Sequence, residues 1–297
     1  MARIQKLMSR RRAHAPLATA APIAASPPLL NAMVIGRGIL FLPFFTTRDA
    51  RHVRGVCREL RALVQDFAWD DRTLESRVAA RVGAVVLWRV CFPRAVACTL
   101  FQGDLETYVG NEVVTDGDLA LLRGVRSLDI GGCENVTDVG LAHVASGHGL
   151  HTLKMISCWE ITDAGFAQLA GIHTLHMVGC DQDTITDAAF AHLAGIHTLY
   201  MVDCNQATIT DVAFAHLAGI HTLYMADCNQ VTITDTAFTH LAGIYELSME
   251  GCNQATITDV AFVHLAGIHT LYMEDCNQAT ITEAALAHLA GIHTLMR

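Results

Sequence analysis

The amino-acid sequence predicts an α/β solenoid, in which short parallel strands alternate with short helices, preceded by a small all-α segment. Three observations predict it: cysteines recur at a regular spacing, the unit around each cysteine is nearly copied, and apolar residues return at the same positions of each unit. The last four cysteine-to-cysteine steps are each 24 residues long. Self-similarity at such a period is typical of repeat proteins, whose units stack in one direction. The repeated cysteines are Cys133, Cys158, Cys180, Cys204, Cys228, Cys252 and Cys276.

The first half of the unit is predicted to form a strand. It is clearest in residues 196–219, which read IHTLYMVDCNQATITDVAFAHLAG. Because side chains alternate along a strand, Leu199 and Met201 point to the same side. Cys204 follows at a bend, where a small and weakly polar side chain is easily buried. Eight such strands are predicted, from Val125 to the end of the chain.

The second half of the unit is predicted to form a short helix. Thr210 or Asp211 is suited to cap its start, and Gly219 supplies a left-handed residue after its end. Phe214 and Leu217 lie three residues apart and give the helix one apolar face. No single unit buries this face alone, so neighbouring units are expected to stack and share one core.

The early units carry a more specific pattern. Residues 128–141 read LDIGGCENVTDVGL, and residues 153–166 repeat the spacing with Cys158 and a second Thr-Asp-x-Gly run. This pattern resembles the cysteine-containing leucine-rich repeat, and the resemblance covers residues 113–297. It implies a leucine-rich-repeat horseshoe. The later units insert Asn-Gln-Ala-Thr after the cysteine and replace the glycine with alanine, which lengthens a loop and leaves the architecture intact.

Charge is divided sharply along the chain. Residues 1–48 contain seven Lys or Arg and no acid, whereas from residue 155 onward there are fifteen Asp or Glu and a single Lys or Arg, Arg297. Nucleic-acid affinity comes largely from Lys and Arg against phosphate, so the repeats are not expected to bind nucleic acid. A basic or neutral protein partner fits this surface better.

The composition indicates in which compartment the protein is expected. No run approaches the ~18 uncharged apolar residues of a membrane helix, so no membrane contact is expected. No C-x-x-C pair occurs, and the repeat cysteines fall at equivalent positions where they stack as thiols. We therefore expect a reduced, intracellular protein of the cytoplasm or nucleus, without a metal or other cofactor.

The region before the repeats divides into three parts. Residues 1–30 form a basic, Ala/Pro-rich tail that is expected to be disordered. A solvated tail is the simplest interpretation of it, and an organelle transit peptide or a nuclear signal at residues 10–12 are the alternatives. Residues 31–70 are predicted to form a helical module, and residues 71–112 a junction with a helix over residues 77–90.

Residues 53–69 carry the second specific pattern. Apolar residues recur at helical spacing in V-x-x-V-C-R-x-L-x-x-L, followed by Asp66 and Trp69. This pattern resembles the F-box, a helical module that docks on the adaptor subunit of SCF-type cullin–RING ubiquitin ligases. The alternative is a helical cap that covers the open end of the solenoid. The resemblance implies adaptor contacts from Ile39, Leu42, Val53, Val56, Cys57, Leu60 and Leu63.

An F-box followed by such repeats is the layout of ubiquitin-ligase substrate receptors, which bind the adaptor, and through it a cullin, and hold an unknown target protein. The alternative function is a free-standing interaction scaffold. No catalytic constellation is visible, so we do not expect an enzyme.

The incomplete last unit suggests end-to-end self-association or a non-functional repeat expansion. The predicted target-binding residues, on the concave face, are His176, Tyr200, Tyr224, Tyr245, Glu246, Ser248, Glu250 and Tyr272.

Histidines form two further ladders. Those from His192 to His288 are placed on the helices, ~8–10 Å apart, which is too far for neighbours to share a zinc ion. Those from His173 to His293 begin the strands, ~4.8 Å apart, but Tyr245 interrupts them. No cysteine or carboxylate completes a ligand shell, so no metal site is expected.

Overall fold

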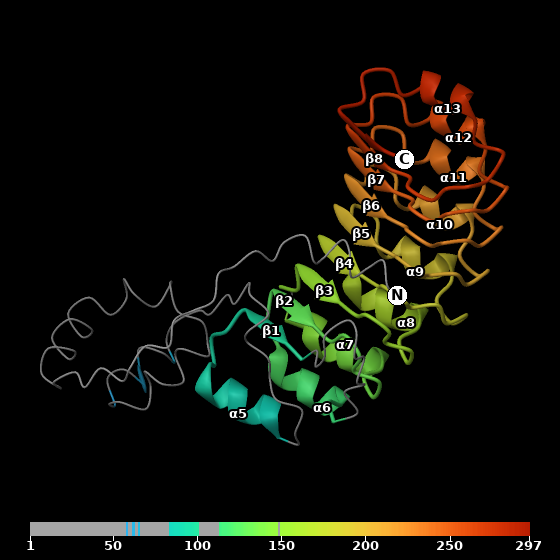
Figure 1. Cartoon of the computed structure of the whole chain (residues 1–297). Helices are drawn as coiled ribbons and strands as arrows, with labels where there is room; N and C mark the ends of the chain where they lie inside the picture. The colour runs from blue at the N-terminus through green and yellow to red at the C-terminus, as the bar shows by residue number, and fades with distance from the viewer. Residues whose placement is uncertain (1–57, 59–60, 63–64, 66–82, 101–112, 148) are drawn as a thin grey trace, which may run out of the picture.

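The computed structural model describes residues 58, 61–62, 65, 83–100, 113–147 and 149–297. Within these residues, nine short strands form one parallel sheet in chain order. Figure 1 shows the strands along the inner edge of a curved array and the helices along its outer edge. The strands are β1 (Ala97–Thr99), β2 (Ser127–Asp129), β3 (Thr152–Lys154), β4 (Thr174–His176), β5 (Thr198–Tyr200), β6 (Thr222–Tyr224), β7 (Glu246–Ser248), β8 (Thr270–Tyr272) and β9 (Thr294–Met296).

A helix precedes β1, and an α-helix lies between each pair of successive strands. Short 3₁₀ helices, Ala120–Leu122 and Ala167–Leu169, extend α6 and α8. The described α-helices are α5 (Ala84–Cys91), α6 (Asp116–Leu119), α7 (Asp138–Ala145), α8 (Asp163–Phe166), α9 (Asp187–Ala191), α10 (Asp211–Ala215), α11 (Asp235–Thr239), α12 (Asp259–Val263) and α13 (Glu283–Ala287). This alternation confirms the predicted α/β solenoid for the described repeats.

The described sheet has one strand more than the eight predicted. The additional strand, β1, lies in the segment that the sequence assigns to a junction, and Cys98 pairs in register with Leu128 of β2. Cys98 is buried like the leucines of later strands. The leucine pattern does not predict β1, because Cys98 occupies the position that a leucine has in the later strands. The helix predicted over residues 77–90 is described from Ala84 to Cys91.

The core is built of columns, each with one residue per repeat. In the repeat centred on α10, Leu199, Met201, Cys204 and Phe214 have no solvent exposure, as predicted. The Cys204 thiol donates to the carbonyl of Met177 in the preceding repeat, at 3.0 Å. A buried cysteine at this bend therefore keeps its weak donor satisfied.

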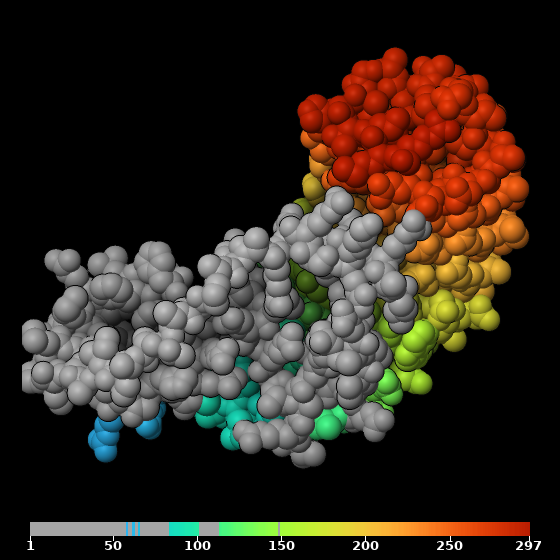
Figure 2. Space-filling view, in the orientation of Figure 1, coloured from blue at the N-terminus to red at the C-terminus, as the bar shows by residue number. Residues whose placement is uncertain are grey.

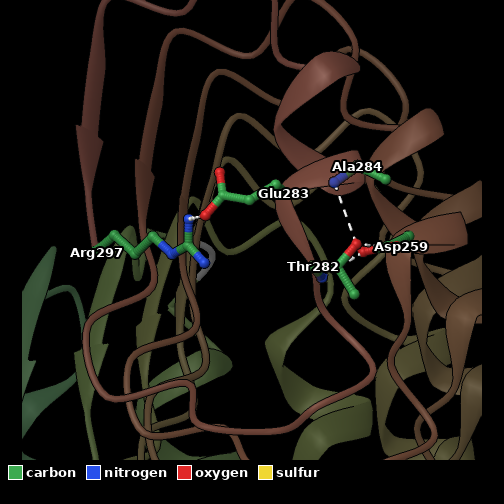
Figure 3. Close-up of polar contacts among 5 residues, drawn as sticks. All are labelled: Asp259, Thr282, Glu283, Ala284 and Arg297. Carbon is green, nitrogen blue, oxygen red and sulfur yellow. Dashed lines mark hydrogen bonds and ion pairs between the residues drawn. The ribbon is translucent and has the colours of Figure 1, made fainter.

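The helix start also joins neighbouring repeats. Thr210 caps α10 by accepting from the Val212 amide at 3.2 Å. Its own amide and hydroxyl donate to the two carboxylate oxygens of Asp187, both at 2.7 Å, and Asp187 begins the preceding helix. Figure 3 shows the last such joint, where Thr282 caps α13 and donates to Asp259. We call each pair an Asp–Thr joint.

The inserted segments, which read Asn-Gln-Ala-Thr or, at residues 229–232, Asn-Gln-Val-Thr, add further links between repeats. The backbone amide of Asn229 donates to the side-chain oxygen of Asn205 at 2.6 Å. The Thr232 hydroxyl donates to the Ile209 carbonyl at 2.7 Å. Gln206 is buried and donates to the Cys180 carbonyl at 3.0 Å. The longer loop therefore adds bonds along the stack, and Figure 2 shows the yellow-to-red repeats as one closely packed body.

Replacing Asp211 with alanine is expected to destabilise the protein by about 1–3 kcal/mol, because Thr234 loses the acceptor of its amide and its hydroxyl. Urea unfolding followed by circular dichroism measures this loss. Asp183→Ala, at an exposed aspartate of a loop, is the control and should change stability by less than about 0.5 kcal/mol. Equal effects of the two substitutions would show that the Asp–Thr joint contributes nothing.

Candidate interaction surface

The inner face of the sheet carries one side-chain column from the last residue of each strand. These residues pair in register from strand to strand, because every strand has the same length and the same register. The central leucines of β2 to β8 point to the core, so their neighbours in each strand point to the inner face. The column, called here the aromatic column from its central members, contains Thr99, Asp129, Lys154, His176, Tyr200, Tyr224, Ser248, Tyr272 and Met296.

Three rings of the aromatic column are stacked face to face. The ring centroids of His176 and Tyr200 lie 4.0 Å apart, and those of Tyr200 and Tyr224 lie 4.4 Å apart, with planes within 5° in both pairs. Burial, and then the charge of Lys154, lowers the pKa of His176 to about 4. At neutral pH the stack is therefore an uncharged aromatic surface with polar edges.

Acidic side chains surround the second half of the column. The Tyr224 hydroxyl donates to Glu246, the first residue of β7. Burial, and then this bond and the charge of Glu246, raises the pKa of Tyr224. Burial and the charges of Glu246 and Glu250 likewise raise the pKa of Tyr272. The phenols are therefore neutral at physiological pH and lie beside carboxylates.

The structure separates the predicted target-binding residues into groups. His176, Tyr200, Tyr224, Ser248 and Tyr272 share the aromatic column, with Glu246 at the start of β7 and Glu250 just after its end. Tyr245 belongs to another column, because its ring stacks between His221 and His269. The predicted adaptor-binding residues, Ile39, Leu42, Val53, Val56, Cys57, Leu60 and Leu63, lie outside the described residues.

The column that contains Tyr245 is a continuous stack of imidazole and phenol rings. Centroid distances are 4.4–4.7 Å from His151 to His293, so Tyr245 continues the ladder that the sequence suggested it interrupts. The prediction also missed His151, whose repeat differs from the copied ones. Each imidazole Nδ1 lies 2.9–3.3 Å from the hydroxyl of the following threonine. The threonines therefore hold the ring orientations.

The histidines that follow the helices do not lie on the helices themselves. His192, His216, His240, His264 and His288 are the C-cap residues, because each helix is only five residues long. Among the described residues, no group of three His, Cys, Asp or Glu side chains is placed to hold a metal ion. No described helix has the length and apolar character needed to cross a membrane. The described cysteines are all free thiols.

Comparisons with known proteins agree with this geometry. Neither a protein-family model nor a curated protein matches the sequence significantly. Among solved structures, the complex of TLR13 with ssRNA13 matches with a TM-score of 0.56 and 16% identity, over 79% of this chain and 33% of that chain. The nine in-register parallel strands decide the fold together with this match. This chain has the leucine-rich-repeat fold.

A second solved structure of similar fold is the complex of Rad7 with Elc1 in yeast. The leucine-rich-repeat protein matches Rad7 with a TM-score of 0.50 and 16% identity, over 71% of its own length and 58% of that chain. It thus spans about a third of one neighbour and under two thirds of the other. At these identities the likeness concerns the fold.

Proposed function

We propose that this leucine-rich-repeat protein is the substrate-recognition subunit of an SCF-type cullin–RING ubiquitin ligase. In this role, an F-box within residues 31–70 docks on the adaptor, and the inner face of the repeats binds the target protein. The protein binds and positions its partners and carries out no chemistry itself. Holding a target beside the ligase raises its effective concentration there. The cytoplasm and nucleus are the compartments that this role requires.

The observation that most supports target binding is the aromatic column. Stacked Tyr200 and Tyr224, with Glu246 beside them, give a rigid surface of large rings and fixed charges. Tyrosine offers contact area and a polar tip at low entropic cost, which is why it is enriched at protein interfaces. Adaptor binding rests on the sequence resemblance of residues 53–69. Rad7, which shares the repeat fold, is likewise found in a complex with another protein.

The second candidate is a free-standing interaction scaffold whose N-terminal segment only caps the solenoid. The cap interpretation is favoured by the open core of a repeat array, which needs cover at its ends. Both candidates use the same inner face, and they differ in whether the adaptor binds. Adaptor binding therefore discriminates between them.

The test is a pull-down of the purified SCF adaptor with the full-length chain. We expect binding, and we expect the double variant Val56→Asp/Leu60→Asp to lose it, because two charges would enter the proposed apolar contact. Val212→Asp/Val260→Asp is the matched control, because both valines are more than half exposed in the repeats. Circular dichroism verifies folding. No adaptor binding by the folded wild-type chain would leave the scaffold function.

A further inference from the structure

A run of carboxylates borders the inner face of the sheet along β5 to β8. The residues two and three positions after each of these strands include at least one aspartate or glutamate, whereas the equivalent residues after β2, β3 and β4 include none. Because the strands are parallel and in register, the residues that follow them lie along one edge of the face. This edge, called here the acidic rim, contains Asp203, Asp227, Glu250, Glu274 and Asp275.

The acidic rim adjoins the tyrosines of the aromatic column. Tyr200, Tyr224 and Tyr272 end three of the same strands, which Figure 1 shows along the inner edge of the array. Burial, and then the charge of Asp227, raises the pKa of Asp203, so rim carboxylates of neighbouring repeats act on one another. The face therefore presents large rings beside mutually repelling negative charges, and this combination favours a ligand with several cations.

The repeats along the rim supply no lysine or arginine of their own. From residue 155 to residue 296 the sequence contains neither. The ion pair between Arg297 and Glu283 lies outside the acidic rim and the aromatic column. The counter-charge for this face therefore has to come from another segment or another molecule.

The same chain contains a segment of opposite charge. Residues 1–30, called here the basic tail, contain five Lys or Arg and no acid. Arginine donates in a fork to carboxylates and stacks on aromatic faces, so it suits both parts of the face. All five basic residues lie within the first twelve positions, and they are Arg3, Lys6, Arg10, Arg11 and Arg12.

The basic tail has the length to reach the acidic rim. Seven strand steps of about 4.8 Å separate β1 from β8, which is about 34 Å in all. A chain of 30 residues without secondary structure, as the sequence predicts for the tail, has an r.m.s. end-to-end distance of about 30 Å and extends at most to about 100 Å. Residues 31–82 add further length between the tail and α5. The tail can therefore span the distance from the start of the array to β8.

We propose that the basic tail docks on the inner face of its own repeats, with the arginines of residues 10–12 against the acidic rim and the tyrosines of β5 to β8. Tethering gives the tail an effective concentration on the order of 1 mM, which a partner in solution lacks. A target protein that binds the same face has to displace the tail. The inference rests on the proposed function where it takes this face as the target-binding surface, and it adds that the target segment is basic and that its binding is autoinhibited.

The first test asks whether the tail occupies the face. A fluorescent peptide of residues 1–14 is titrated with the wild-type chain and with the full-length variant Arg10→Gln/Arg11→Gln/Arg12→Gln, called here the neutral-tail variant. Fluorescence anisotropy at physiological salt measures the affinities. We expect the neutral-tail variant to bind the peptide about tenfold or more tightly than the wild type, because its own tail no longer competes. Equal affinities, or no binding to either protein, would overturn the proposal.

A charge-matched variant controls for the change in net charge. Arg94→Gln/Arg123→Gln/Arg126→Gln removes three positive charges from exposed positions before and in the first repeats. It should bind the peptide within about twofold of the wild type. A gain in affinity equal to that of the neutral-tail variant would show general charge attraction and would overturn the docking of the tail.

The second test locates the contact on the repeats. Asp203 and Asp227 have φ angles of 58° and 57°, in the left-handed region that asparagine also adopts. Asp203→Asn/Asp227→Asn, made in the neutral-tail variant, is therefore compatible with the fold and should weaken peptide binding about tenfold or more. Glu160→Gln/Asp183→Asn removes the same charge from exposed positions outside the rim and should leave binding within about twofold. With folding verified by circular dichroism, equal effects of the two pairs would overturn the assignment to the rim.

Two further measurements separate this proposal from others. Light scattering should show a monomeric wild-type chain, and an oligomer that the neutral-tail variant dissolves would show that the tail binds a second copy. Adaptor pull-downs are run on the same proteins. Adaptor binding without any gain in peptide affinity overturns the docking of the tail alone. A gain in peptide affinity without adaptor binding supports the docking and overturns the ligase role.

Discussion

Raising the pH from 8 to 10 is expected to destabilise this protein by several kcal/mol. Burial raises the pKa of Cys133 and Cys180 to about 12, and nearby aspartates act in the same direction. Burial likewise raises the pKa of the thiols between and after them well above its ordinary value. The thiols with this shift are Cys158, Cys204, Cys228 and Cys252.

The direction of the change in stability with pH follows from the raised pKa of these thiols. In the unfolded chain these thiols ionise from about pH 8.5, whereas in the folded protein Cys133 and Cys180 remain protonated to about pH 12 and the pKa of the other four is raised in the same direction. Their stabilising contribution is complete below the unfolded pKa and is lost as the pH rises toward the folded pKa. At pH 10 the loss is about 2 kcal/mol for each of Cys133 and Cys180, and the other four thiols lose stability in the same direction. A loss of this size is a large part of the total stability of an ordinary domain.

Urea unfolding at pH 7.5, 9 and 10, followed by circular dichroism, measures this loss. Cys228→Ser is the matched control, since serine keeps a donor for the Met201 carbonyl and does not ionise in this range. This variant has one buried thiol fewer. Its free energy of unfolding should therefore fall with pH less steeply than that of the wild type, by the contribution of one ionising group. A wild-type protein equally stable at pH 8 and pH 10 would contradict the expectation.

Replacing Phe238 with alanine is expected to cost about 3–5 kcal/mol. Phe238 has no solvent exposure and lies in the core column with Phe214 and Phe262 of the adjacent repeats. The cavity therefore opens at the contact between units, where a repeat protein derives most of its cohesion. Urea unfolding at neutral pH measures the loss of stability.

Two controls give this prediction a scale. Phe238→Leu keeps most of the buried volume and should cost less than about 1.5 kcal/mol. Val231→Ala, at a valine 68% exposed, should change stability by less than about 0.5 kcal/mol. If Phe238→Ala were as mild as Val231→Ala, the column of phenylalanines would not hold the repeats together.

The repeat core could be predicted from the sequence because its residues obey local periodicity. Leu199, Met201 and Cys204 are separated by strand and bend geometry alone, and all three are buried. Strand β1 was not predicted because Cys98 breaks the leucine pattern, although pairing with β2 defines it. The helix was predicted to reach Leu217, but α10 ends at Ala215 and leaves Leu217 in the following turn.

The candidate site was predictable as a set of positions and not as an arrangement. Alternation along a strand places Tyr200 and Tyr224 on the inner face, and the broken copy at Ser248 is visible in the sequence. Ring orientation is not encoded in spacing. The stacking of Tyr200 on Tyr224, and of Tyr245 between two histidines, depends on side-chain torsions that neighbouring strands set together.

The Asp–Thr joints make this chain tolerant of changes in its own length. Asp187 with Thr210, and Asp211 with Thr234, are the same chemical connection 24 residues apart. Unequal recombination between near-identical stretches of the gene would remove or add whole units, and each new boundary would again bring an aspartate to a threonine. The earlier repeats keep the same connection at slightly different spacing, since Thr137 donates to Asp116 and Thr162 donates to Asp138. The loss or gain of a whole unit would therefore leave every remaining repeat joined to its neighbour by the same bonds.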